Sequence, residues 1–212
     1  MLKIYGNKTF NAVKAVLTAE ELGLDYEYLV VDFASGEMKS PEFLKIHPLG
    51  KVPAMTHNGE AIFESNNMCR YLANISGKKL YSDDPLEAAR IDQTVDLIAH
   101  HVGKWITTYF FEEIVKKAFG RGDPDPAAIE EAKGFLDQQL PYLDGLLADN
   151  DFLCGKDMTI ADCVAFAMIM AHEYTSFEIS DHKNICRWYD QIKARPSFDA
   201  MMKHFPGGYD FS

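Results

Sequence analysis

The stretch from His47 to Leu72, HPLGKVPAMTHNGEAIFESNNMCRYL, decides the fold of this chain. Pro53 stands at the entrance of a short apolar run, Val52 to Thr56, and a proline has no N–H for a sheet ladder and can adopt a cis bond. Asn58-Gly59 predicts a type I′ hairpin turn, because both residues tolerate positive φ. Ala61 to Phe63 then supplies the returning strand.

A helix is expected directly after this hairpin. Ser65 is the predicted N-cap of a helix over Asn66 to Ser76, and Gly77 suits the position that follows its end. Free N–H groups and the helix dipole favour a bound anion at such a start. The Ser65 hydroxyl can bind a carboxylate, and the Glu64 side chain can bind an ammonium group. A free α-amino acid has a carboxylate and an ammonium group. For the Glu-Ser pair alone, a capped helix without a ligand is the simpler interpretation.

PLGKVPA, the hairpin and ESN together resemble the glutathione-binding half of the cytosolic glutathione transferase family. The resemblance implies that the backbone of Val52 and Pro53 pairs with the cysteinyl residue of glutathione. It also implies that Glu64 and Ser65 hold the γ-glutamyl end. Near the C-terminus, an apolar helix followed by Arg195-Pro196 is similar to the same family, so the resemblance spans nearly the whole chain.

The order of elements before residue 80 is typical of a thioredoxin-like domain. Strands are predicted over Leu2 to Tyr5 and Tyr26 to Val31, and helices over Asn11 to Leu22 and from Ser40-Pro41 onward. With the hairpin, this gives a four-stranded mixed sheet with helices over residues 1–79. A linker over 80–85 then leads to an all-α domain, 86–212, that would carry the electrophile site. Its predicted helices cover 86–119, 126–148, 161–171, 184–194 and 197–205, and Thr159 to Asp162 reads as a capping box.

The charge and the cysteine spacing of the chain argue against several classes of partner and cofactor. The formal net charge of −11 argues against a nucleic-acid or anionic membrane surface as partner. The four cysteines show no C-x-x-C spacing, so neither a zinc site nor a dithiol redox site is indicated. The N-terminus lacks the apolar core of a signal peptide, and the longest apolar run is too short to span a bilayer. A cytoplasmic protein without a metal is expected.

A glutathione enzyme must lower the pKa of a thiol that ordinarily titrates near ~8.5. In the turn after the first strand, Thr9-Phe10-Asn11 resembles the Thr-x-Asn pattern of some bacterial and fungal transferases, in a theta-like or nu-like class. The implied role of Thr9 or Asn11 is to donate a hydrogen bond to the sulfur, worth roughly 1.5–3 kcal/mol. Alternatively both residues only cap the helix. Tyr5 is a competing candidate, although strand alternation favours its burial.

The resemblance also implies which residues contact the glycine end of glutathione and where the second substrate lies. Lys39 and Lys51 match positions that bind the glycine carboxylate of glutathione, whereas Met38 stands where several related classes have a histidine. The second substrate is expected between the domains, against a wall formed by Trp105, Thr108 and Tyr109.

Three functions are compatible with these residues. The first is a detoxifying glutathione transferase in which the thiolate attacks a small hydrophobic electrophile. The second uses the same thiolate on a peroxide or a mixed disulfide. The third is a binding or scaffold protein without turnover, against which the full glutathione set argues. The family also implies a homodimer, with the helix that starts at Ser65 near the two-fold axis.

Overall fold

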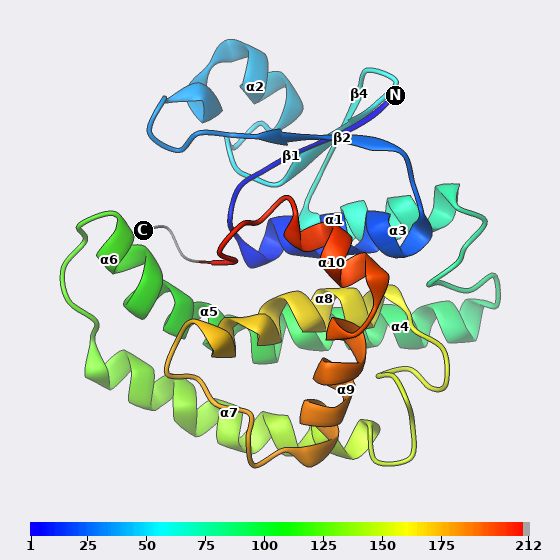
Figure 1. Ribbon diagram of the computed structural model, residues 1–212, viewed down its shortest axis with the longest axis vertical. Coiled ribbons are helices and arrows are strands. Elements are labelled where there is room, and N and C mark those ends of the chain that lie inside the picture. Colours follow the sequence, from blue (N-terminus) through cyan, green and yellow to red (C-terminus); the bar gives the residue numbers. More distant parts are fainter. Residues whose placement is uncertain (210–212) are drawn as a thin grey trace.

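The computed structural model of this chain describes residues 1–209, in which a small sheet is followed by a bundle of helices (Figure 1). The first half contains β1 Leu2–Gly6, α1 Phe10–Leu22, β2 Tyr26–Val30, the 3₁₀ turn η1 Glu37–Lys39, α2 Pro41–Ile46, β3 Ala54–His57, β4 Glu60–Phe63 and α3 Ser65–Ile75. The strand order is β2-β1-β3-β4. Strand β1 runs parallel to β2 and antiparallel to β3, and β3 and β4 form the antiparallel hairpin. The predicted four-stranded mixed sheet is confirmed.

The two faces of the sheet are covered by different helices. Helices α1 and α3 lie on one face and α2 on the other (Figure 1). Side chains alternate accordingly, so that Ile4 and Met55 are buried in the large core with α1, while Ala54 packs with Phe43 of α2. The Tyr5 ring also lies on the α2 side, with its centroid 6.1 Å from that of Phe43. The sheet therefore presents α1 and α3 to the rest of the molecule.

The second half is helical. It contains α4 Pro85–Leu97, the π-helical turn η2 Ile98–Val102, α5 Gly103–Tyr109, a second π-helical turn η3 Phe110–Val115, α6 Lys116–Ala118, α7 Pro126–Leu146, α8 Ile160–Ile169, the 3₁₀ turn η4 Met170–Glu173, α9 Lys183–Lys193 and α10 Pro196–Met202. The first five elements, from α4 to α6, follow one another without a break and form one helical path, in which η2 and η3 are π-helical turns. Within residues 1–209, no helix has the length and apolar character needed to cross a membrane.

Helix α8 is the axis of the helical half, and all ten of its residues are buried. It begins with the predicted capping box, in which Thr159 and Asp162 cap each other's backbone. The Asp162 carboxylate also accepts hydrogen bonds from the Leu153 N–H at 2.8 Å and from the Trp188 indole at 3.0 Å. Burial raises the pKa of Asp162, and the hydrogen bonds to its carboxylate oppose that effect. This acid therefore ties α8 to the loop before it and to α9.

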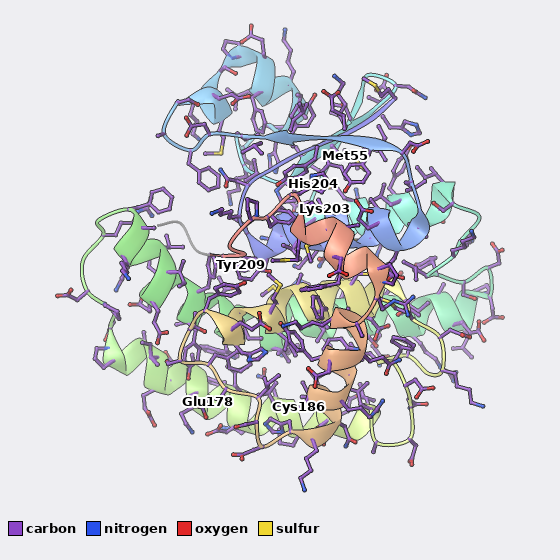
Figure 2. All side chains as sticks on the ribbon, in the orientation of Figure 1. Met55, Glu178, Cys186, Lys203, His204 and Tyr209 are labelled. Atoms are coloured by element: carbon purple, nitrogen blue, oxygen red, sulfur yellow. The ribbon has the colours of Figure 1, made fainter. Side chains whose placement is uncertain are left out.

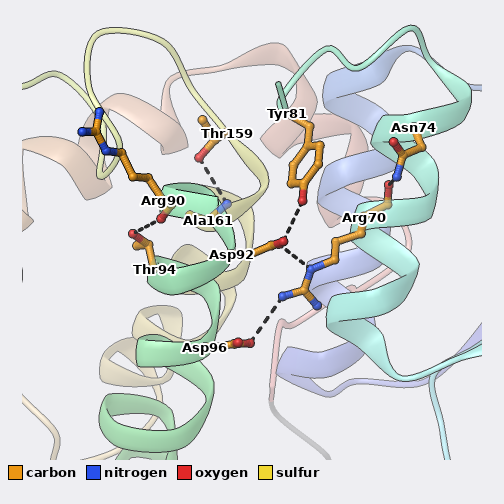
Figure 3. A network of polar contacts seen from close by, with 9 residues as sticks. All are labelled: Arg70, Asn74, Tyr81, Arg90, Asp92, Thr94, Asp96, Thr159 and Ala161. Carbon is orange, nitrogen blue, oxygen red and sulfur yellow. Dashed lines mark hydrogen bonds and ion pairs between the residues drawn. The ribbon is translucent and has the colours of Figure 1, made fainter. Parts of the chain in front are cut away.

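Two ion-pair clusters join the sheet half to the helical half. Arg70 of α3 donates to Asp92 at 2.6 Å and to Asp96 at 3.3 Å, and the Tyr81 hydroxyl donates to Asp92 at 2.7 Å (Figure 3). On the other side, Arg195 pairs with Glu21 of α1 at 2.6 Å. The two halves are thus held together along α3 and α1.

The last described segment passes beside the start of α1. Tyr209 is fully buried, and its hydroxyl donates to the Ala167 carbonyl at 2.6 Å (Figure 2). Its ring centroid lies 5.5 Å from that of Phe110 and 6.5 Å from that of Phe10. Tyr209 therefore supports the first residue of α1, next to the Thr-x-Asn turn.

Candidate active site

Strand register brings three separate segments to one end of the sheet. Tyr5 pairs with Ala54, and Ala54 pairs with Phe63. The turn after β1, the chain that enters β3 and the chain that leaves β4 therefore converge. The peptide bond between Val52 and Pro53, just before β3, is cis.

In the Thr-x-Asn turn, the two candidate residues make different contacts. Thr9 is the N-cap of α1, and its Oγ1 accepts from the Ala12 N–H at 3.3 Å. Asn11 instead reaches α3, where its Oδ1 accepts from the Ser65 hydroxyl at 3.2 Å. The same oxygen accepts from the Lys14 ammonium at 2.9 Å. Thr9 therefore caps α1, as the alternative interpretation of this turn held.

Helix α3 begins one residue earlier than predicted. Glu64 is its N-cap, with φ 68° and ψ 109°, and Ser65 is its first helical residue. The prediction of Ser65 as N-cap is therefore corrected. A positive φ at a non-glycine residue costs of order 1–3 kcal/mol, and such strain clusters at ligand sites. The exposed Glu64 side chain makes no capping hydrogen bond, which leaves it available to a ligand.

A cleft of about 470 Å³ opens between the two halves beside Asn11 and Ser65. The sheet half contributes mainly polar side chains to it, and the helical half contributes small and apolar ones together with a lysine. The lining residues are Phe10, Asn11, Lys14, Glu64, Ser65, Asn66, Ala99, Gly103, Lys104, Thr107 and Met168. Ala99, Gly103 and Thr107 are small residues that line the same wall of the cleft.

The residues predicted for the second-substrate wall lie elsewhere on the same helical path. The Trp105 ring stacks on that of Phe135 in α7 with centroids 4.1 Å apart, and the Tyr109 ring lies 5.8 Å from that of Phe177. Thr108 donates to a backbone carbonyl within its own helix. Trp105 and Tyr109 belong to the apolar stripe that faces the core. The cleft is lined by a neighbouring face of the helix, just after the π turn η2.

The two lysines expected at the glycine carboxylate lie near the entrance of β3. Lys39 donates to the Leu49 carbonyl at 3.3 Å, beside Gly50. Gly50 has φ +59°, and a Cβ there would lie 2.4 Å from the Met38 carbonyl oxygen, so the chain needs glycine at this point. Lys51, the next residue, is exposed.

Sequence analysis did not single out His47, which lies next to this region. His47 is buried with its ring 4.9 Å from that of Phe63, and its Nδ1 accepts from the Leu49 N–H. Burial lowers the pKa of His47, so its ring is neutral at pH 7 and helps to fix the loop before β3.

Lys14 is a second residue that sequence analysis did not single out. Its side chain is only 4% exposed, and burial lowers its pKa to about 8, against the opposing influence of Cys69 and Glu64. One sequence feature could have indicated Lys14: it is the single charged residue in the mainly apolar segment 10–19. Lysine is almost never fully buried unless it is paired.

Within residues 1–209, no three His, Cys, Asp or Glu side chains are grouped as a metal site would require. The fold and the cleft define a class: a two-part protein in which a thioredoxin-like sheet and a helical bundle enclose a cleft lined by polar, charged and small residues.

Comparison with known proteins defines the family. Residues 1–74 match the N-terminal domain of glutathione S-transferase, and residues 99–196 match its C-terminal domain. The chain belongs to the glutathione S-transferase family of enzymes. It is 29% identical to glutathione S-transferase hmp2 of Hypomyces subiculosus, across 93% of this chain and 96% of that protein.

Solved structures agree with this assignment. Glutathione transferase F2 from Populus trichocarpa superposes with a TM-score of 0.90 at 26% identity, covering 98% of this chain and 100% of the other. Glutathione S-transferase I from maize, in complex with an atrazine glutathione conjugate, superposes with a TM-score of 0.88 at 26% identity, covering 95% and 98%.

Proposed function

We propose that this chain is a glutathione transferase that holds glutathione as a thiolate for attack on hydrophobic electrophiles. The observation that carries the proposal is the hydrogen bond from Ser65 to Asn11. It joins the start of α3, which suits an α-amino acid, to the start of α1, which suits a thiolate, on the wall of one cleft. Family membership supports the same conclusion.

The polar side of the site matches glutathione group by group. The γ-glutamyl carboxylate accepts from the Ser65 hydroxyl and from free N–H groups at the start of α3. The γ-glutamyl ammonium lies at the Glu64 carboxylate. The backbone of Val52, which precedes Pro53, pairs with the cysteinyl residue. The ammonium groups of Lys39 and Lys51 together bind the glycine carboxylate.

The chemical step uses hydrogen bonds rather than a protein base. Neither Thr9 nor Asn11 takes up a proton at neutral pH, so the thiol proton leaves to water. The Asn11 Nδ2 donates to the sulfur, and the helix dipole of α1 adds a favourable field of roughly 0.3–1 kcal/mol. The thiolate forms a new S–C bond with the electrophilic carbon, and the leaving group departs with the bonding electron pair.

The acceptor lies against the small residues of the helical half. Gly103 is packed so closely that a Cβ would lie 2.7 Å from the Ile98 carbonyl oxygen and 2.9 Å from the Met168 methyl. A side chain at 103 would therefore distort the turn at Ile98 and displace the Met168 side chain. Ala99 and Thr107 extend the same surface, which suits a flat apolar acceptor.

A second use of the same thiolate is reduction of a mixed disulfide or a peroxide. Among residues 1–209, no cysteine lines the cleft, so bound glutathione supplies the attacking sulfur. In the disulfide reaction, an S–S bond forms with one substrate sulfur and the other leaves as a thiolate. The Thr-x-Asn turn supports this alternative, because the bacterial proteins that it resembles include disulfide reductases that use glutathione.

We further propose a homodimer that covers exposed apolar residues. Leu49 is 63% exposed and Phe63 38%, both near the entrance of β3. The helical half offers a mainly apolar hollow of about 230 Å³ with Leu97, Val102 and Tyr142 in its lining. One copy can place an exposed side chain, Leu49 or Phe63, in the hollow of the other copy. This contact would lie close to α3, where the family implies the dimer interface.

The direct test combines calorimetric titration with glutathione and assays with an aryl halide, a peroxide and a mixed disulfide. We expect saturable binding and glutathione-dependent conjugation of the aryl halide. Binding with turnover of only the disulfide or the peroxide would favour the reductase alternative. No binding at millimolar glutathione would overturn the proposal and leave a scaffold role.

A further inference from the structure

Lys14 is unusual because a lysine side chain is rarely buried in the interior of a protein. It lies in the second turn of α1, and it is the one buried lysine among residues 1–209. Helix α1 is enclosed by the sheet, α3, α8 and α10, so the alkyl stem of Lys14 is surrounded by protein. Its ammonium reaches the cleft beside Asn11.

The contacts of Lys14 fix the orientation of the Asn11 amide. An amide has a donor end and an acceptor end, and an ammonium only donates. The end that faces Lys14 Nζ at 2.9 Å is therefore the oxygen. Ser65 donates to the same oxygen at 3.2 Å. When glutathione binds and the Ser65 hydroxyl turns to the γ-glutamyl carboxylate, Lys14 remains as the donor that holds the acceptor end of the Asn11 amide, so the NH₂ group faces the ligand.

Charge in the cleft adds a second argument. The charged residues that line it are Lys14, Glu64 and Lys104, and Cys69 of α3 also faces Lys14. Once the γ-glutamyl ammonium neutralises Glu64, Lys14 is left without a negative partner next to Asn11. A thiolate bound at Asn11 supplies that negative charge next to a buried ammonium, where pairing is stronger than in bulk water.

We propose that Lys14 is a positioning residue for this reaction: it holds the Asn11 amide with its NH₂ group toward the glutathione sulfur and supplies the buried positive charge that stabilises the thiolate. This inference rests on the proposed function. It assigns the activating charge to a residue outside the Thr-x-Asn motif, and it names Asn11 rather than Thr9 as the donor to the sulfur.

The test compares Lys14→Met, which keeps length but removes donor and charge, with Lys14→Arg, which keeps both. Lys183→Met, at an exposed lysine in the first turn of α9, is the matched control. For each variant, calorimetry gives the glutathione Kd, and the ultraviolet thiolate band against pH gives the thiol pKa of the complex. Thermal unfolding verifies that each variant is folded.

We expect Lys14→Met to raise the thiol pKa of bound glutathione by roughly one to three units, the range for loss of a nearby opposite charge. The glutathione Kd should change less than threefold at a pH where the thiol is protonated. Lys14→Arg should restore most of the lowered pKa, and Lys183→Met should match the wild type. A Lys14→Met complex with the wild-type thiol pKa would overturn the inference, as would a weaker Kd with an unchanged pKa.

A double-mutant cycle with Asn11→Ala separates positioning from a general loss of structure. Because Lys14 is proposed to act largely through Asn11, Lys14→Met should have a smaller effect in the Asn11→Ala background than in the wild type. Equal effects in both backgrounds would contradict the positioning role even if Lys14→Met is destabilised. Failure of the wild type to bind glutathione would instead contradict the proposed function itself.

Discussion

The Ser65 hydroxyl lies 3.2 Å from Asn11 Oδ1, although the two residues are 54 positions apart in the chain. This contact joins the first turn of α3 to the first turn of α1. Both helices lie on the same face of the sheet (Figure 1). The candidate site is therefore formed where two helix N-termini meet, which concentrates free N–H groups around one ligand.

Ser65→Ala should weaken glutathione binding. The hydroxyl is proposed to donate to the γ-glutamyl carboxylate, and a hydrogen bond to a charged group is worth roughly 1.5–3 kcal/mol. At about 1.4 kcal/mol for each factor of ten, the Kd should rise roughly 10- to 100-fold. Calorimetric titration measures this, with Ser180→Ala at an exposed serine as control. A Kd within twofold of the wild type would rule out this role for Ser65.

Lys14 predicts a specific pH dependence of stability. Its pKa is about 8 in the folded protein, below its ordinary value of 10.5. Between these values the unfolded chain binds more protons, so the free energy of unfolding rises with pH. At about 1.4 kcal/mol per pH unit, the wild type should gain roughly 3 kcal/mol relative to Lys14→Met from pH 8 to 10.5. Urea unfolding of both proteins across this range checks it, and a constant difference would contradict the lowered pKa.

Asp162→Ala should destabilise the helical half strongly. The substitution leaves four donors without their acceptor, namely the N–H groups of Leu153 and Thr159, the Thr159 hydroxyl and the indole of Trp188. A buried donor without a partner costs about 1–3 kcal/mol, so we expect a loss of at least about 3 kcal/mol in urea unfolding. Asp149→Ala, at an exposed acid after α7, should change stability by less than about 0.5 kcal/mol. Equal losses for both variants would argue against the capping account.

Leu49→Glu should weaken the proposed dimer. A charge placed at this exposed apolar residue opposes burial in the hollow of a second copy. Sedimentation velocity over a range of concentrations should show dimeric wild type and a shift toward monomer for the variant. Leu86→Glu is the control, because Leu86 is 60% exposed at the start of α4. A monomeric wild type, or equal behaviour of both variants, would contradict the proposed interface.

Local sequence signals predicted most of the fold. The Asn58-Gly59 turn specified the hairpin, and the Thr159–Asp162 pattern specified the start of α8. Both signals act within a few residues, which is why they can be recognised without a structure. Helix α3 starts one residue earlier than predicted, because Glu64 takes the N-cap position with φ 68°, a conformation that its residue type does not favour.

The remaining features of the site depend on contacts between distant elements. The burial of Lys14 follows from the packing of four elements around α1, which no local pattern specifies. The face of α5 that lines the cleft depends on how α5 packs against α7 and α8, which are distant in the sequence. Trp105 and Tyr109 belong to the core, while Gly103 and Thr107, on another face of the same helix, line the cleft.

The central claim is that an Asn11 hydrogen bond lowers the pKa of bound glutathione. Its most direct test is the ultraviolet thiolate band of the complex against pH for wild type, Asn11→Ala and Thr9→Ala. The account predicts a thiol pKa below that of free glutathione in the wild type and in Thr9→Ala, and a value roughly one to two units higher in Asn11→Ala. A pKa in Asn11→Ala equal to that of the wild type would contradict the account.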